Sequence, residues 1–275
     1  MQKIDSHQHF WQYDPVKHDW IDDTMKMIRK DFLPGDLQPV LKENNFDGCI
    51  AVQADQTEAE TNFLLALQQE NTFIKGIVGW VDLRQDNIRE RLSWYKQFAA
   101  VKGFRHVLQG EAPEFMLQPK FLNGIAALEE LEFTYDILIF PKHLAAAITL
   151  VKQFPRQKFV IDHIAKPYIK KGLLGEWKQA MKIIAQHENV YCKISGMVTE
   201  ADYQYWKKED FTLYIDAVVE AFGTKRIMYG SDWPVCLVAA SYTNMLNIVK
   251  DYFAHFSTTE QDNFFGNNAA SFYKL

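Results

Sequence analysis

Eight short runs rich in β-branched and aromatic residues alternate with longer amphipathic segments, and this alternation limits the possible folds of the chain. Repeated βα units predict a parallel sheet that is either closed into a barrel or left open and doubly wound. The predicted strands are residues 3–9, 47–53, 74–81, 101–108, 133–140, 158–163, 190–195 and 226–231. The helical patterns between them include residues 58–69, 122–130, 174–186, 211–222 and 242–253.

Two observations favour the closed barrel over the open sheet. No glycine-rich phosphate loop follows the first strand, where an open nucleotide-binding sheet often carries one. The chain has 275 residues, a normal length for an α/β barrel, and no Pro/Gly/Ser-rich linker divides it. We therefore predict an α/β chain that forms one domain over residues 1–275, a (β/α)₈ TIM barrel.

Two sequence patterns predict helix starts. Thr57 with Glu60, and Ser257 with Glu260, have the spacing of capping boxes. The second pair lies beyond the eighth βα unit, so it predicts an extra helix at the C-terminal end of the chain.

The lengths of the connections predict which face of the barrel is functional. The helix-to-strand connections at residues 70–72 and 223–224 are short. The strand-to-helix connections at residues 10–33 and 196–210 are long and rich in aromatic residues. Long loops in compact domains are commonly functional, and barrel enzymes build their sites on the strand-to-helix face. We expect the active site there.

Charge and cysteine content limit the kinds of binding partner and the cellular compartment that we expect. The net charge of −5 comes from 30 Lys and Arg against 35 Asp and Glu, without a basic stripe, which argues against a nucleic-acid partner. Three widely spaced cysteines argue against a disulfide framework. We find neither a signal-peptide pattern nor an apolar run of about 18 residues. We expect a cytoplasmic protein that binds a small molecule and no membrane.

His7, His9 and Asp232 are the first candidate site residues. His7 and His9 are two positions apart at the end of the first predicted strand, so both imidazoles can face the barrel mouth. Asp232 follows the eighth strand, which neighbours the first strand in a closed barrel. A carboxylate there can bind a metal ion or accept a proton from water. The alternative for Asp232 is an N-cap of the next helix, two residues before Pro234.

Further candidates lie at the ends of other strands. His163 ends the sixth strand, and Arg105 near the end of the fourth can polarise a carbonyl oxygen. His106 follows Arg105 and faces the opposite way in a regular strand, so a structural role competes with substrate binding. Other candidates for binding sugar hydroxyls and ring faces lie at or just past strand ends, with a core role as the alternative: Gln53, Trp80 and Trp233.

Four segments resemble the amidohydrolase superfamily, and more narrowly the sugar lactonase group of its amidohydrolase-2 branch. They are residues 4–11 (IDSHQHFW), 103–106 (GFRH), 162–167 (DHIAKP) and 230–234 (GSDWP). They occur in order over nearly the whole chain. The group includes hydrolases of L-fuconolactone and L-rhamnonolactone and related pyrone-dicarboxylate lactonases. The resemblance implies a distorted (β/α)₈ barrel in which Asp232 activates the hydrolytic water.

The function expected from this resemblance is hydrolysis of a sugar lactone, a carboxylic ester, in carbohydrate catabolism. Arg105 and His163 would stabilise the developing oxyanion as positive groups, while Asp232 takes a proton from water and returns it to the ring oxygen. The alternatives are a metal-dependent decarboxylase of the same branch and a barrel that binds a ligand without turnover.

The fifth strand departs from the metal-dependent members of the superfamily. Its predicted tip, residues 136–141 (DILIFP), has neither the His nor the Lys that those members use as a ligand. This argues against a two-metal site. A single divalent cation, zinc first, can still be held by His7, His9 and Asp232 with one position open. A reaction without any metal is the other expectation.

Overall fold

The computed structural model describes residues 2–275, and its eight strands form one parallel sheet in chain order. The predicted TIM barrel is confirmed. Its strands are β1 Ile4–Gln8, β2 Gly48–Val52, β3 Ile74–Gly79, β4 Val101–Val107, β5 Thr134–Leu138, β6 Phe159–Ile161, β7 Val190–Ile194 and β8 Ile227–Tyr229. The first and last strands meet just beyond their ends, where the His9 amide donates to the Trp233 carbonyl at 2.7 Å.

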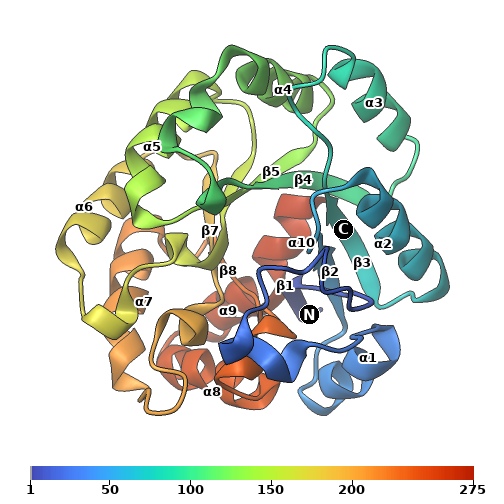
Figure 1. Ribbon diagram of the computed structural model, residues 1–275. Coiled ribbons are helices and arrows are strands. Elements are labelled where there is room, and N and C mark those ends of the chain that lie inside the picture. Colours follow the sequence, from blue (N-terminus) through green and yellow to red (C-terminus); the bar gives the residue numbers. More distant parts are fainter. Residues whose placement is uncertain (1) are drawn as a thin grey trace.

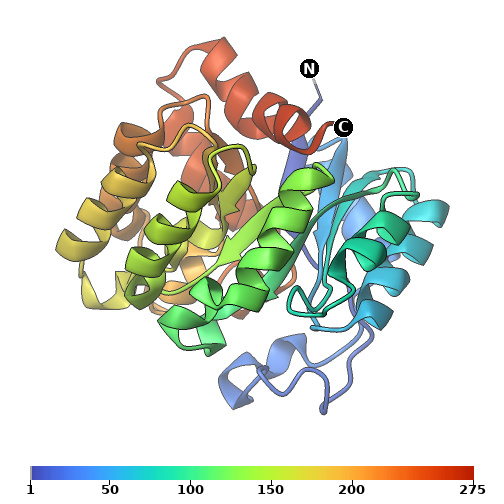
Figure 2. The same ribbon diagram turned by 90° about the horizontal axis from the view of Figure 1, so that it is seen from above.

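Helices α1 to α8 surround these strands (Figure 1), as the βα repetition predicts. They are α1 Pro34–Glu43, α2 Glu58–Glu70, α3 Ile88–Tyr95, α4 Pro119–Glu130, α5 Leu144–Gln153, α6 Gly175–Ile184, α7 Glu209–Phe222 and α8 Tyr242–Phe253. The predicted additional C-terminal helix is present as α9 Thr258–Asp262, and α10 Asn268–Tyr273 follows it. Figure 2 shows this C-terminal segment at one end of the barrel and the loop after β1 at the other.

Both predicted helix starts are present, but their capping differs. The Ser257 hydroxyl accepts from the Glu260 amide, and the Glu260 carboxylate accepts in return from the Ser257 amide at 3.0 Å. The Thr57 hydroxyl accepts from the Glu60 amide in the same way. The Glu60 carboxylate instead accepts from the Ala54 amide at 3.0 Å, so the prediction of a complete box at Thr57 was wrong. That contact holds the strand-to-helix loop against α2.

The strands end earlier than predicted, most clearly at β6 and β8. His163 lies two residues beyond β6 and Asp232 three beyond β8, so neither belongs to a strand. The backbone leaves the extended conformation at both places: residues 163–166 have φ of 47° to 59°, and Asp232 has φ of 58°. Non-glycine residues seldom adopt this left-handed conformation, which costs about 1–2 kcal/mol each. These turns place both side chains over the barrel mouth.

The hydrophobic core has two layers. The larger cluster lies between the strands and the surrounding helices. A smaller cluster includes Ile4, Val78 and Met228 together with Phe272 and Tyr273 of α10. These α10 side chains fill the end of the barrel where the strands begin. Within residues 2–275, every helix is too short or too polar to span a bilayer.

Candidate active site

A cavity of about 440 Å³ opens at the end of the barrel where the strands finish. The long loop after β1 contributes Lys17 and Trp20 to its wall, and the loop after β7 contributes Tyr203. Both long connections therefore border the cavity, on the face predicted to be functional. The remaining wall comes mainly from strand ends and shorter loops, including His9, Ala54, Asp55, Gln56, Arg105, Val107, Gln109, Leu138, His163, Lys166, Glu200 and Asp232.

A larger hollow of about 790 Å³ lies at the opposite end of the barrel, against α10. No imidazole lines it among residues 2–275, and its carboxylates are paired with surface cations, for example Glu129 with Arg156 and Glu132 with Lys274. The cavity at the strand ends, although smaller, is the one that holds groups capable of acid–base chemistry.

Three imidazoles and one carboxylate meet at the floor of this cavity. The Asp232 Oδ1 atom lies 3.4 Å from His9 Nε2, 3.8 Å from His163 Nε2 and 3.9 Å from His7 Nε2. The Nε2 atoms of His7 and His9 are 3.2 Å apart. His7 lies on β1, His9 lies just beyond its end, and His163 and Asp232 lie in the turns after β6 and β8. The barrel therefore brings together groups that are far apart in the sequence. All four side chains are almost completely buried.

An irregularity in β1 turns the two histidines inward. The pairing of β1 with β2 shifts register between Asp5 and Gln8. Ile4 belongs to the cluster inside the barrel, and strict alternation from there would turn His7 outward. A bulge of this kind re-aims side chains and is common beside active sites.

Two glycines leave room for the imidazoles. A Cβ at Gly196 would lie 2.5 Å from His163 Nδ1, and a Cβ at Gly230 would lie 2.6 Å from the His7 Cβ. Gly196 also has φ of 59°, which glycine adopts without strain.

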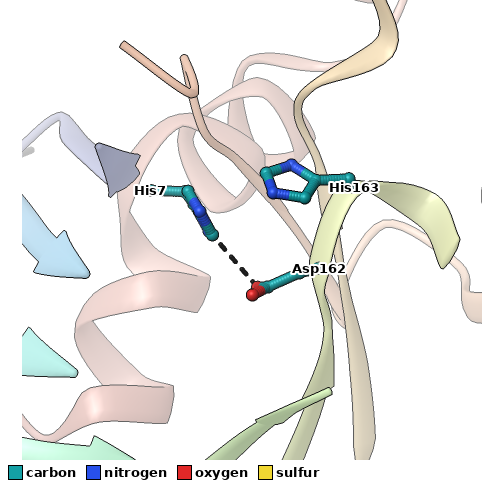
Figure 3. A group of neighbouring side chains, drawn as sticks. All are labelled: His7, Asp162 and His163. Atoms are coloured by element: carbon teal, nitrogen blue, oxygen red, sulfur yellow. Dashed lines mark ion pairs between the residues drawn. The ribbon is translucent and has the colours of Figure 1, made fainter. Parts of the chain in front are cut away.

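A second set of contacts fixes the ring orientations. The Nδ1 atom of His9 is 2.8 Å from the Val52 carbonyl oxygen, and that of His163 is 2.9 Å from the Ser195 hydroxyl. The His7 Nδ1 atom is 3.2 Å from Asp162 Oδ1, and Figure 3 shows the two side chains pointing toward each other beside His163. The Nδ1 atoms are thus occupied, while the Nε2 atoms face Asp232.

Burial sets the protonation states of the site. Burial lowers the pKa of His7 and of His163 well below the usual 6.5, so both imidazoles are neutral at physiological pH. Burial alone would raise the pKa of Asp232, but the neighbouring His163 and the hydrogen bond with His9 outweigh it and lower that pKa. Asp232 is therefore an ionised carboxylate beside the neutral rings of His7 and His163. The expectation that His163 is a positive group was wrong, because its burial removes the charge.

Arg105 lies on the cavity wall and places a positive charge beside His7. Its Nη1 atom is 3.1 Å from Asp162 Oδ2 and 3.2 Å from His7 Nε2, and its Nη2 atom donates to the Gln53 carbonyl oxygen. These contacts hold the guanidinium rigidly, with its charge directed at the floor of the cavity.

The donor set at the floor fits a single divalent cation. Tetrahedral zinc with bonds of about 2.1 Å places its ligand atoms about 3.4 Å apart. The separations among His7 Nε2, His9 Nε2 and Asp232 Oδ1 are 3.2, 3.4 and 3.9 Å. Both histidines have their other ring nitrogen against an oxygen, as metal-binding histidines usually do. A second group, His7 with Asp162 and His163, is also close enough, but Asp162 already contacts Arg105 and Lys193.

The structure places the other predicted substrate-binding residues outside the cavity wall. Trp233 is buried against Phe10 and Phe32, and the Gln53 side chain donates to the Arg105 backbone carbonyl. His106 stacks on the Phe115 ring and accepts from the Trp80 indole N–H at 3.3 Å. The interpretation of His106 as facing away from Arg105 agrees with this placement.

The sequence reasoning did not single out several polar residues of the site. Asp162 was seen only as the neighbour of His163, and Lys166 only as part of a motif. Lys193 is fully buried in the middle of an apolar strand, where a charged residue is rarely found without a partner. That mismatch between a charged residue and its predicted apolar environment is the signal that could have identified Lys193.

Comparison with known proteins is consistent with this geometry. Residues 4–275 match the sequence profile of the amidohydrolase-2 family, and the description of that family is "Amidohydrolase". An L-fucono-1,5-lactonase of Burkholderia multivorans is 36% identical, over 99% of this chain and 96% of that protein. An L-fucono-1,5-lactonase of Burkholderia ambifaria is 34% identical over the same shares. A crystal structure of an amidohydrolase from Burkholderia multivorans with bound zinc is 36% identical, covers 100% of both chains and superposes with a TM-score of 0.97.

Proposed function

Because this chain belongs to the amidohydrolase-2 family, as its motifs predicted, we propose that it is a lactonase that opens a sugar lactone such as L-fucono-1,5-lactone. The observation that carries the proposal is the position of Asp232, an ionised carboxylate within 4 Å of three imidazole nitrogens at the floor of a polar cavity. Full-length relatives at 34% and 36% identity are lactonases, which supports the choice of an ester bond.

In the proposed mechanism Asp232 is the general base. Its carboxylate takes a proton from a water molecule, which attacks the lactone carbonyl carbon, and the protonated Asp232 then delivers the proton to the departing ring oxygen. The Arg105 charge and an N–H of neutral His163 stabilise the developing oxyanion. His163 has this N–H at Nε2 when the Ser195 hydroxyl donates to its Nδ1.

We further propose that His7, His9 and Asp232 hold one divalent cation, with zinc as the first candidate. The zinc-bound crystal structure of the relative supports this assignment. When bound, such an ion lowers the pKa of a water molecule and polarises a carbonyl group. A lactone already has an alcohol leaving group, so the residues of this chain can also act on it with less Lewis-acid assistance.

The polarity of the cavity wall supports a hydroxylated substrate. Lys166 pairs with Glu200 at 2.5 Å, and Asp55, Gln56 and Gln109 add acceptors and donors. Such groups pair with sugar hydroxyls by hydrogen bonds, whereas a purely apolar ring would leave them unpaired.

A lactone panel tests the proposal. Sugar lactones are supplied to metal-stripped and to zinc-loaded protein, and acid release is followed with a pH indicator. We expect hydrolysis of at least one aldonolactone, and a loss of kcat of about 10²–10⁴-fold in Asp232→Asn. Asp86→Asn, which changes an exposed carboxylate on the surface, is the matched control.

Two results would contradict the proposal. One is that no aldonolactone is opened with or without zinc. The other is that Asp232→Asn retains full kcat. Release of carbon dioxide from aromatic carboxylates, without lactone hydrolysis, would instead support the decarboxylase alternative.

A further inference from the structure

A buried chain of charged groups lies beneath the proposed active site and is not used in the mechanism above. Lys193 on β7 points into the barrel and is 0% exposed. Its ammonium contacts the Asp136 carboxylate on β5, lies 3.0 Å from Asp162 Oδ1 and lies 3.2 Å from His7 Nδ1. A single side chain therefore links the interior of the barrel to a candidate metal ligand.

The chain of contacts continues away from the site to the C-terminal helix. The Tyr273 hydroxyl of α10 donates to Asp136, with distances of 3.0 and 3.2 Å to its two oxygens. At the other end, Arg105 contacts Asp162. The two cations Lys193 and Arg105 thus balance the two carboxylates Asp136 and Asp162, all of them almost fully buried. Buried charges persist only when they are paired in this way.

The contacts of Asp162 determine which nitrogen of His7 carries the proton. If Nδ1 is protonated, it donates to Asp162, and Nε2 can accept from Arg105. If Nε2 is protonated, Nδ1 accepts from Lys193, and the Nε2–H can donate to His9 Nε2 at 3.2 Å but not to the Arg105 guanidinium, which has no acceptor. Only the first arrangement has His7 donate to the buried Asp162 carboxylate, which is a charge-assisted hydrogen bond. It also leaves Nε2 with its single lone pair unprotonated, so a cation beside His9 and Asp232 could take that lone pair in place of Arg105.

We propose that Lys193 is a positioning residue: anchored by Asp136 and Tyr273, it holds Asp162 as the acceptor of the His7 Nδ1–H, which keeps His7 Nε2 unprotonated and directed at the proposed metal position. This inference rests on the proposed function, in which His7 is a metal ligand. Lys193 itself touches no substrate. It also places a positive charge beside the second group of possible ligands, His7 with Asp162 and His163, which leaves one cation position in the site.

The first test measures the tautomer of His7. In metal-free protein labelled with ¹⁵N-histidine, we expect the ring nitrogens of His7, assigned by their loss in His7→Gln, to show protonated Nδ1 and bare Nε2. In Lys193→Met, we expect a mixture of tautomers or a reversal. An unchanged Nδ1–H tautomer in a folded Lys193→Met protein would overturn the proposal.

The second test measures zinc affinity by competition with a chelating dye. We expect a loss of about 10–100-fold in Lys193→Met, the size typical of changes behind a metal ligand. Asp136→Asn removes the charge that anchors Lys193 but keeps Lys193 itself and nearly the same side-chain volume at position 136. It therefore tests the same claim if the Lys193→Met protein does not fold. We expect it to shift both the tautomer and the affinity in the same direction.

A matched control separates positioning from general destabilisation. Leu128→Ala removes a buried side chain from α4 in the outer core, remote from the charged chain. Its melting temperature should fall, while the His7 tautomer and the zinc affinity stay at wild-type values. Equal losses of zinc affinity in Leu128→Ala and Lys193→Met would contradict a positioning role. Failure of the lactone panel together with the expected tautomer shift would reject the proposed function and leave the role of Lys193 intact.

Discussion

Glu60 on α2 carries a largely buried carboxylate that contacts a loop of the cavity wall. It accepts from the Ala54 amide and so holds the loop that supplies Ala54, Asp55 and Gln56 to the cavity wall. Burial is the largest effect on Glu60 and raises its pKa to about 7. The hydrogen bond from the Ala54 amide and the charge of Lys17 lower this pKa, whereas the charge of Asp55 raises it. This carboxyl group therefore links the stability of the protein to pH near neutrality.

We expect the free energy of unfolding to fall as the pH rises from about 4.5 to 7, because Glu60 ionises first in the unfolded chain. Glu60→Gln keeps an acceptor for the Ala54 amide and cannot ionise. It should match the wild type at pH 5 and exceed it by about 2–3 kcal/mol at pH 8.5. Urea unfolding at both values measures this difference. Identical pH dependence in the two proteins would show that Glu60 is not the linked group.

At the level of helices and strands, much of the fold was predictable because its signals are local. Alternating apolar runs and helical periodicity depend on residues close in sequence, and all eight strands and the C-terminal helix were located from them. The strand ends after β6 and β8 were not. The left-handed turns at residues 163–166 and at Asp232 contain no glycine, so the sequence lacks the usual marker of that conformation.

The candidate site was predictable in part for a similar reason. The rule that sites lie at strand ends drew attention to His7, His9, His163 and Asp232, which the barrel brings together. The same rule fails for Trp233, because a side chain just past a strand can turn back into the core. The contacts of Lys193 join β7 to β5, β6 and β1 in space, and no local pattern encodes them.

The turn after β7 offers a test of how closely this segment is fitted to His163. Gly196→Ala would place a methyl group 2.5 Å from His163 Nδ1 and force alanine into φ of 59°. Gly172→Ala is the matched control, since Gly172 has φ of 63° with no atom near the added Cβ. We expect the control to lose only the backbone term of about 1–2 kcal/mol. Gly196→Ala should lose more and also reduce kcat, because His163 must move.

Thermal unfolding and lactone assays of the two alanine variants measure this contrast. Equal melting temperatures and unchanged kcat in both would mean that the turn can shift without disturbing the imidazole.

For the whole molecule, the barrel is closed differently at its two ends. Side chains of α10 fill one end, together with the charged chain that reaches Tyr273. The loop after β1 projects from the other end (Figure 2), pinned at its base by the bridge between Trp11 and Phe32. The Trp11 indole N–H also donates to the Lys30 carbonyl. The sealed end thus supports the floor of the cavity, and the loop supplies part of its wall.

This arrangement predicts how zinc should affect global stability. The proposed ligands join β1 to the segment after β8, where the barrel closes, so unfolding must release the ion. At a free zinc concentration 100 times Kd, binding adds about 2.7 kcal/mol. That corresponds to a rise in melting temperature of about 5–10 °C for a protein of this size. Chelation should reverse the rise.

Variants at two histidines make the test specific. His9→Asn removes one proposed ligand and should abolish most of the zinc-dependent rise, whereas His255→Gln changes an exposed imidazole outside the cluster and should preserve it. Differential scanning calorimetry with and without chelator gives both values. A rise that persists in His9→Asn would mean that zinc stabilises the protein elsewhere. The ion would connect the end of β1 to the segment that follows β8. Its loss should therefore destabilise the contact between the first and last strands before it affects the outer helices.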